Sequence, residues 1–131
     1  MIDGPFVLVV EDDKPCASLL KHMLSRSGYR VTVAEDGYAA QNSIDSLAQP
    51  PHLVLLGLML PFVDGYQLLR QIRRKSEWAD TPVIILSAKS QEQDIVRAFD
   101  LGASDYVTKP FQLGELLARI RSQINKGQRH G

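Results

Sequence analysis

Three adjacent carboxylates, Glu11, Asp12 and Asp13, directly follow the apolar run 6–10. Neighbouring carboxylates repel one another in a confined site, and a hard divalent cation bound through oxygen relieves that repulsion. Mg²⁺ typically uses one or two such side chains and keeps several waters. Glu11 and Asp12 are therefore candidate magnesium ligands. The more common role of such a triplet is a solvated acidic loop that caps a helix.

Two further polar side chains follow apolar stretches. Ser87 comes after the run 82–86, and Lys109 comes after the short segment 105–108. A serine after a strand is usually structural, and a lysine before a proline is usually just exposed. The set of these residues with the acidic triplet is more specific than any one of them.

The segments that must position these residues alternate between two patterns. Apolar runs without polar alternation are typical of strands buried on both faces of a parallel sheet, and they are separated by helical spacing of apolar residues. We expect five strands alternating with five helices, hence a doubly wound α/β fold. The expected strands are 6–10, 31–34, the first half of 53–61, 82–86 and 105–108.

The longest apolar stretch, 53–61, is interrupted by Gly57. A glycine in a strand often marks a bend or a close approach to the backbone. In parallel sheets, ligands bind beyond the carboxyl ends of the strands. This rule selects one neighbourhood, which consists of Glu11, Asp12, Asp13, Gly57, Ser87 and Lys109.

Composition limits the classes of function. A chain of 131 residues fits one domain, which we expect over 1–125, with a polar tail over 126–131. Fifteen basic and fifteen acidic residues give zero net charge, which argues against direct nucleic-acid binding. The single cysteine, Cys16, suits a reducing cytoplasm, and no apolar run or signal pattern indicates a membrane segment.

The sequence resembles the receiver domain of bacterial two-component response regulators from about Phe6 to Ile124. The resemblance implies a flavodoxin-like (βα)₅ fold with strand order 2-1-3-4-5. The matching segments are 8–13 (LVVEDD), 58–61 (LMLP) with 64–65 (DG), 82–88 (PVIILSA) and 102–111 (GASDYVTKPF).

The resemblance assigns a role to each matching site residue. It implies that Glu11 and Asp12 bind Mg²⁺ together with the backbone carbonyl of Met59. Ser87 corresponds to the switch hydroxyl that bonds a phosphoryl group, and Tyr106 to the aromatic residue that changes rotamer. Lys109 corresponds to the cationic partner of the phosphoryl oxygens. The resemblance also implies that the peptide bond between Lys109 and Pro110 is cis.

One position departs from the family pattern. Gly57 stands where the family has the aspartate that accepts phosphate from a histidine kinase, and glycine offers no nucleophile. Asp13 and Asp64 are other nearby carboxylates, but neither inherits that position. Either the chain is a natural pseudo-receiver, or it is an Asp-to-Gly variant of a working receiver. The retained Glu11 and Lys109, with the other site residues, favour the second explanation.

The leading interpretation is a signalling module that is not an enzyme. Its partners would be a histidine kinase or other signalling protein, and an output domain following the chain. Charges on the face of the fourth helix, fifth strand and fifth helix resemble a receiver dimer face, or are solvated surface charges. The charged residues are Arg97, Asp105, Glu115 and Arg119, with Ile95 and Ser104 where charges are expected.

The alternative is a Mg²⁺-dependent phosphohydrolase or a ligand-binding module on the same scaffold, since fold alone does not decide function. Asp12 or Asp13 would be its nucleophile. No glycine-rich loop follows the first strand, which argues against a nucleotide or flavin phosphate site.

Without a phosphoryl group, we expect the inactive conformation, with the Ser87 loop withdrawn and Tyr106 pointing outward. The opposite arrangement would favour a pseudo-receiver that is constitutively on. We also expect Lys109, which lacks a carboxylate at position 57, to turn to Glu11, Asp12 or water, because a partly buried ammonium needs a partner.

Overall fold

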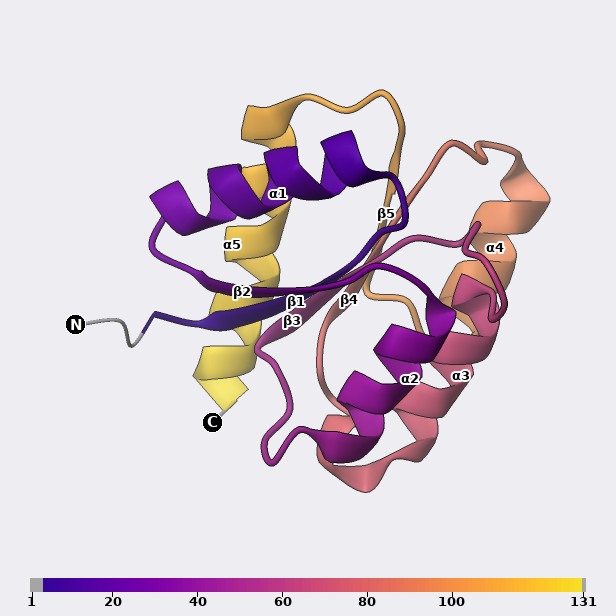
Figure 1. The fold of residues 1–131 in the computed structure, drawn as a ribbon, viewed down its shortest axis with the longest axis horizontal. Helices are drawn as coiled ribbons and strands as arrows, with labels where there is room; N and C mark the ends of the chain where they lie inside the picture. The colour runs from indigo at the N-terminus through magenta and orange to yellow at the C-terminus, as the bar shows by residue number, and fades with distance from the viewer. Residues whose placement is uncertain (1–3, 131) are drawn as a thin grey trace.

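The computed structural model describes residues 4–130, and side chains over residues 4–127. Strands and helices alternate along the whole chain (Figure 1). The elements are β1 (Phe6–Val10), α1 (Lys14–Arg26), β2 (Arg30–Ala34), α2 (Gly37–Ser46), β3 (Leu53–Leu56), α3 (Gly65–Arg74), the 3₁₀ turn η1 (Ser76–Trp78), β4 (Val83–Ser87), α4 (Glu92–Asp100), β5 (Asp105–Thr108) and α5 (Leu113–His130).

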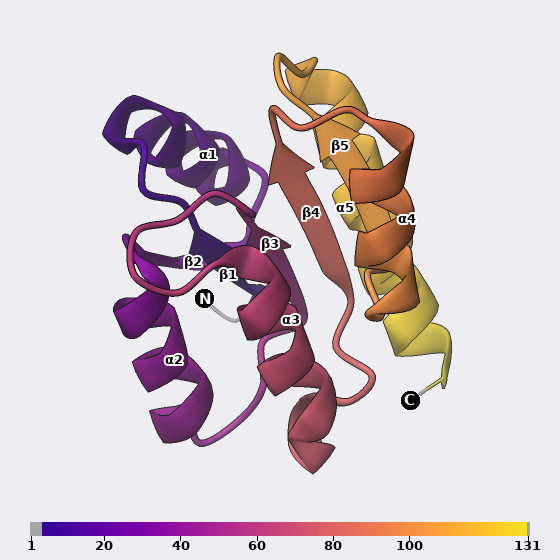
Figure 2. The same ribbon diagram turned by 90° about the vertical axis from the view of Figure 1, so that its right-hand side faces the viewer.

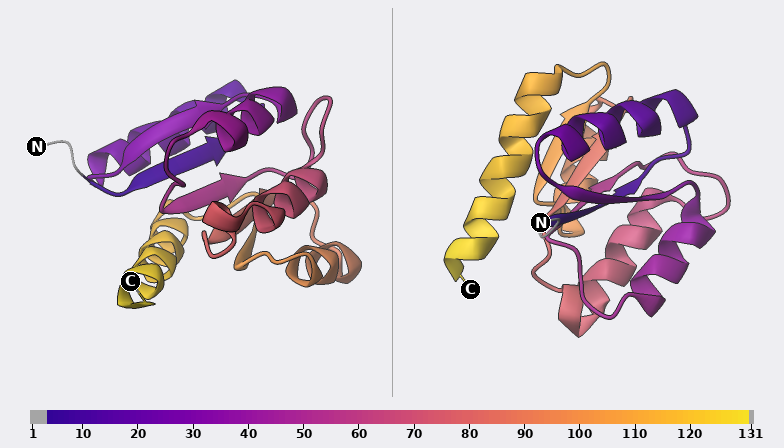
Figure 3. Two further views of the ribbon diagram at one scale, coloured as in Figure 1. Left: turned by 90° about the horizontal axis from the view of Figure 1, so that it is seen from below. Right: turned by 60° about the vertical axis from the view of Figure 1, so that its left-hand side comes forward.

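All strand pairs are parallel, and the sheet order is β2-β1-β3-β4-β5, which confirms the predicted fold. Helices α1 and α5 cover one face of the sheet, and α2, α3 and α4 cover the other (Figures 1 and 3). Alternate residues of each strand enter the two cores, as in β1, where Val7 and Val9 face α1 and α5 while Leu8 and Val10 face the other helices. Burial on both faces explains why β1, β3 and β4 lack polar alternation.

Aspartates begin three of the helices. The side chains of Asp13, Asp36 and Asp64 accept hydrogen bonds from backbone N–H groups in the first turns of α1, α2 and α3. Gln67 completes a capping box at α3 by accepting a bond from the N–H of Asp64. These caps fix where each loop at the carboxyl edge of the sheet ends.

Ser90 and Gln93 have the residue types and spacing of a capping box, but they do not form one. Helix α4 begins after Gln91, which makes no side-chain cap. The Gln93 side chain instead donates through Nε2 to the side-chain oxygen of Gln91 at 2.9 Å. The start of α4 therefore lacks the side-chain cap that the starts of α1, α2 and α3 have.

The carboxyl end of α3 is fixed by Arg73. Its guanidinium donates to the carbonyl oxygen of Gly102 at 2.8 and 2.9 Å and to that of Thr81 at 2.7 Å. Burial lowers the pKa of Arg73 from its usual value. One side chain thus joins α3 to the segments that precede β4 and β5.

Helix α5 continues to His130, so residues 126–130 of the expected polar tail are helical. Lys126 is a good helix former, and the exposed Gly127 does not interrupt the backbone. Over the part of the chain that the structure describes, no helix is both long and apolar enough to cross a membrane.

Candidate functional site

The carboxyl ends of four strands bring Glu11, Gly57, Ser87 and Lys109 together. The N–H of Gly57 donates to the carbonyl oxygen of Val10 at 3.0 Å, and the N–H of Lys109 donates to that of Ser87 at 2.9 Å. The Lys109 side chain then reaches across the sheet edge to Glu11. The predicted neighbourhood of strand-end residues is present, and the Lys109–Pro110 peptide is cis as expected.

Lys109 and Glu11 form an ion pair with a separation of 2.7 Å between Nζ and Oε1. The side chain of Glu11 is only 4% exposed and that of Lys109 is 28% exposed. Burial alone would lower the pKa of Lys109, but the hydrogen bond and the charge of Glu11 raise it above its ordinary value. The expectation that Lys109 turns to a nearby carboxylate is confirmed.

Gly57 is buried between neighbouring strands, and its backbone does not have the positive φ that would require glycine. A Cβ placed there would lie 3.3 Å from the carbonyl oxygen of Val10 and 3.5 Å from Cδ2 of Leu60. The first contact is tight and needs a shift of a few tenths of an ångström. A side chain at this position is therefore compatible with the backbone.

The predicted magnesium ligands are Glu11, Asp12 and the backbone carbonyl of Met59, and they do not form a ready metal site. Glu11 already accepts from Lys109 through Oε1 and from the N–H of Asp13 through Oε2. Asp12 is exposed, and Met59 lies in the loop after β3. Among the described residues, no group of three or more His, Cys, Asp or Glu side chains is placed to hold a metal ion. These residues do not fit a tightly held Mg²⁺.

The other acidic candidates have structural roles. Asp13 accepts the N–H of Cys16 at 2.9 Å, and Asp64 accepts the N–H of Gln67 at 3.0 Å. Cys16 itself is half-buried, and burial together with the charge of Glu11 raises the pKa of its thiol to about 11. None of these side chains replaces a carboxylate at position 57.

Ser87 and Tyr106 meet at one residue of the β4–α4 loop. The N–H of Lys89 donates to Ser87 Oγ at 3.1 Å, and the Tyr106 hydroxyl donates to the carbonyl oxygen of Lys89 at 2.8 Å. Tyr106 also packs against the core formed with α2, α3 and α4. Burial raises the pKa of Tyr106, and its contact with the Ser87 hydroxyl opposes that rise. The expectation that Tyr106 points outward is wrong.

Sequence reasoning missed Tyr66, which lies beside this loop. Tyr66 is 4% exposed, and its hydroxyl donates to the carbonyl oxygen of Asp94 at 3.2 Å. The Arg97 guanidinium lies over its ring, 4.0 Å from the centroid, which explains why Arg97 does not join the other charged residues of the expected dimer face. An aromatic residue early in an amphipathic helix was the only signal in the sequence.

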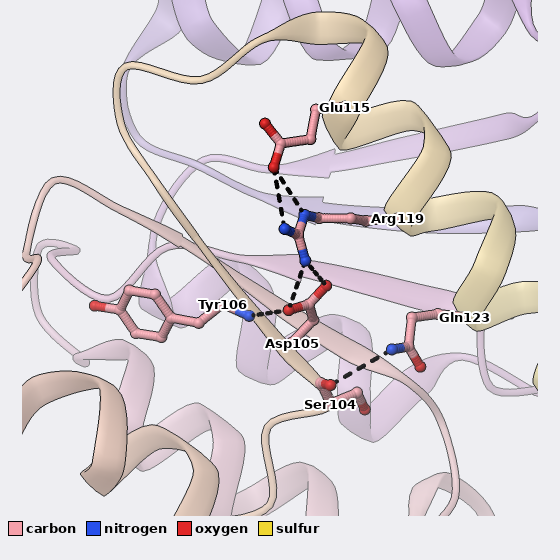
Figure 4. Close-up of polar contacts among 6 residues, drawn as sticks. All are labelled: Ser104, Asp105, Tyr106, Glu115, Arg119 and Gln123. Carbon is pink, nitrogen blue, oxygen red and sulfur yellow. Dashed lines mark hydrogen bonds and ion pairs between the residues drawn. The ribbon is translucent and has the colours of Figure 1, made fainter. Parts of the chain in front are cut away.

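The other charged residues of the expected dimer face form a network within one chain (Figure 4). They are Asp105, Glu115 and Arg119. Arg119 donates to both oxygens of Asp105, at 3.0 and 3.3 Å, and to Glu115 Oε1, at 3.0 and 3.3 Å. These two carboxylates raise the pKa of Arg119. A groove of about 390 Å³ runs along this face between α4, β5 and α5, and Ile95 and Phe99 contribute its apolar wall.

Comparisons with known proteins agree with this geometry. The sequence model described as "Response regulator receiver domain" matches residues 7–121. The DNA-binding dual master transcriptional regulator RpaA of Synechocystis sp. (strain ATCC 27184 / PCC 6803 / Kazusa) is 41% identical over 125 residues, which are 95% of this chain and 51% of the relative. The chain thus spans about half the length of that curated relative.

Two solved structures are similar over nearly their whole length. The receiver domain of the Francisella response regulator 1452 is 34% identical with a TM-score of 0.87, covering 95% of this chain and 99% of that one. The receiver domain of sensor histidine kinase PA1611 from Pseudomonas aeruginosa PAO1 is 33% identical with a TM-score of 0.84, covering 93% and 98%. The PA1611 structure contains a magnesium ion coordinated in its active site cleft.

Proposed function

This chain belongs to the response regulator receiver domain family, and we propose that it acts as a receiver that signals through protein contact without an aspartyl phosphate. Receiver domains act in two-component signal transduction as regulatory modules. The departure from that chemistry lies in a single residue of the strand-end neighbourhood.

The observation that carries the proposal is Gly57. Aspartyl phosphate forms when a carboxylate oxygen attacks phosphorus and the bond from phosphorus to the donor breaks, releasing the imidazole nitrogen of a phosphohistidine or the carboxylate oxygen of acetyl phosphate. Glycine has no side-chain oxygen for this attack. The other carboxylates near the site are engaged elsewhere: Glu11 pairs with Lys109, while Asp13 and Asp64 cap helices. Asp12 alone is exposed without such a role, and it follows β1 rather than β3.

Two further observations bear on the origin of Gly57. A Cβ there requires a shift of only a few tenths of an ångström, and Glu11, Ser87 and Lys109 remain in place, which supports the loss of an aspartate from an otherwise intact receiver. The inward position of Tyr106 supports the competing explanation, a pseudo-receiver whose switch adopts this arrangement without a phosphoryl group.

We infer that Mg²⁺ binds weakly, because the cation must compete with the ammonium of Lys109 for Glu11 and lacks a carboxylate at position 57. When bound, it would neutralise charge at Glu11 and Asp12. The backbone carbonyl of Met59 is a further candidate ligand.

The partners follow from the face made by α4, β5 and α5. Its apolar groove and the network of Asp105, Glu115 and Arg119 support contact with a second copy, a histidine kinase or another signalling protein. Because RpaA is a DNA-binding regulator about twice as long as the matched region, an output domain after this segment is also part of the proposal.

Incubation with acetyl phosphate and Mg²⁺, followed by intact-mass measurement, tests the proposal. The protein should gain no phosphoryl group, whereas Gly57→Asp should gain one that hydroxylamine removes. A hydroxylamine-sensitive phosphoryl group on the unchanged chain would contradict the proposal. Failure of a folded Gly57→Asp protein to react would favour the pseudo-receiver explanation over recent loss of the aspartate.

A further inference from the structure

Two exposed aromatic rings from different elements stack on the surface. Tyr38 is in the first turn of α2, and Phe62 is in the β3–α3 loop. Their centroids are 4.9 Å apart and their planes differ by 12°. Tyr38 is nevertheless 60% exposed and Phe62 is 71% exposed. The contact thus leaves most of both side chains in solvent, and we call the pair the aromatic platform.

The backbone of Phe62 is in an unfavourable conformation for a phenylalanine. Its φ of 74° is the only positive value among the non-glycine residues that the structure describes. Left-handed backbone suits glycine or asparagine, and a bulky residue there is an outlier. Phe62 therefore presents its ring where a smaller residue would be more stable, which points to a role for the ring.

The loop that carries Phe62 packs closely against the start of α2 (Figure 2). A Cβ on Gly37 would lie only 2.5 Å from the backbone oxygen of Val63, so only glycine permits this approach. The Asp64 capping box fixes the other end of the loop. A platform held in this way loses little conformational freedom when a partner binds.

The sequence flanking both residues of the aromatic platform is acidic. No lysine or arginine occurs between Arg30 and Arg70, whereas Glu35, Asp36 and Asp64 lie within three residues of Tyr38 or Phe62. Of these carboxylates, Glu35 also lines a groove with Lys14 and Lys21 of α1.

We propose that the aromatic platform docks a basic amphipathic segment of a partner protein. An aliphatic side chain of the partner would cover the rings, and its lysine or arginine side chains would meet the carboxylates or lie over a ring face. This interaction needs no phosphoryl group and is independent of the residue at position 57.

A second copy of the chain is a poor occupant. A two-fold contact through the platform would bring the same carboxylates of both copies together, which is unfavourable. The basic residues Arg70 and Arg74 of α3 line a groove together with Gln67 and Gln71. None of these four is an aliphatic residue that could cover the rings of another copy.

Backbone amide NMR of the chain during titration with a synthetic helical peptide of leucine and lysine tests the proposal. We expect the largest shift changes at Tyr38, Phe62 and Val63, and weaker binding at higher salt. Phe62→Gly suits the backbone and removes the ring, so it should keep the fold and weaken binding at least about tenfold. Glu35→Gln should reduce the salt dependence.

The control variant is Leu19→Ala, which removes an exposed apolar side chain from α1 and should bind the peptide as the unchanged chain does. The proposal fails if folded Phe62→Gly binds with unchanged affinity, or if the shifts fall on another face. It also fails if a leucine–glutamate peptide binds equally well. Self-association that sedimentation shows to depend on Phe62 would replace the proposed partner with a second copy.

Discussion

The ammonium of Lys109 lies 2.7 Å from the carboxylate of Glu11, and this pair joins the carboxyl ends of β5 and β1. Gly57 offers Lys109 no side-chain carboxylate, and the ammonium pairs with Glu11 instead. A buried carboxylate is stable only with a partner, and Lys109 is the cation within reach. The pair therefore links local stability, metal affinity and the chemistry of the site.

Replacing Lys109 should destabilise the fold because Glu11 loses its partner. Lys109→Met keeps the aliphatic stem but leaves the nearly buried Glu11 without its cation, so we expect the free energy of unfolding to fall by about 1–3 kcal/mol. Urea denaturation at neutral pH measures the change. The control is Lys21→Met on the exposed surface of α1, which should shift the midpoint little. Equal effects of both variants would contradict the importance of the pair.

The same pair predicts a loss of stability at alkaline pH. The folded-state pKa of Lys109 is raised above its ordinary 10.5, so its contribution is complete below that pH and is lost as pH rises through the folded-state pKa. Unfolding measured across this range should show a steeper decline for the unchanged chain than for Lys109→Met. Parallel curves for the two proteins would contradict the predicted linkage.

Magnesium binding should be limited by competition with Lys109. We expect calorimetric titration to give weak binding that Glu11→Gln and Asp12→Asn reduce further. Lys109→Met should strengthen binding by freeing Glu11, and Gly57→Asp should strengthen it by adding a carboxylate. Tight binding that is unaffected by changes at Glu11 and Asp12 would reject these residues as ligands.

The contact between Tyr106 and the β4–α4 loop should be measurable by hydrogen exchange. Tyr106→Phe removes the bond to the Lys89 carbonyl, so amides near Lys89 should exchange faster and stability should fall by about 0.5–1.5 kcal/mol. Tyr29→Phe, on the other core, is the matched control and should leave that loop unchanged. Unchanged exchange in Tyr106→Phe would show that the loop does not depend on this hydroxyl.

The fold was predictable because the runs of β1, β3 and β4 carry no polar alternation, which is typical of strands covered on both faces. The strand-end rule also collected Glu11, Ser87 and Lys109 before their contacts were known. Side-chain direction was not predictable in the same way. Tyr106 makes an inward bond to a loop carbonyl, a choice that depends on tertiary contacts and leaves no pattern in the sequence.

The residue types of Ser90 and Arg97 suggest roles that these residues do not have in the structure. Ser90 has the residue type of a helix cap, but α4 starts after Gln91, whose side chain accepts from Gln93. Arg97 has the charge expected of a dimer face, but the ring of Tyr66 attracts its guanidinium. In both cases a local side-chain contact overrode the role that residue type suggested.

Arg73 should matter for stability more than any exposed arginine. Arg73→Lys keeps the charge but cannot reproduce the forked bonds to Gly102 and Thr81, so we expect a loss of about 2 kcal/mol. Arg74→Lys, the exposed neighbour on the same helix, is the control and should stay within about 0.5 kcal/mol of the unchanged protein. Thermal and urea unfolding of both variants provide the comparison, and similar stabilities would show that the fork is dispensable.

Arg119 should affect association rather than folding. Its pairs with Asp105 and Glu115 are partly or largely exposed to solvent, and such pairs contribute about 0–1 kcal/mol, so Arg119→Ala should unfold almost as the unchanged chain does. If the face made by α4, β5 and α5 mediates self-association, this variant should dimerise less in sedimentation experiments over a concentration series. Arg121→Ala, which removes an exposed arginine two residues along the same helix, provides the control. An unchanged dimer in Arg119→Ala would exclude this charged network from the dimer contact, whereas a change shared with Arg121→Ala would indicate only an effect of total charge.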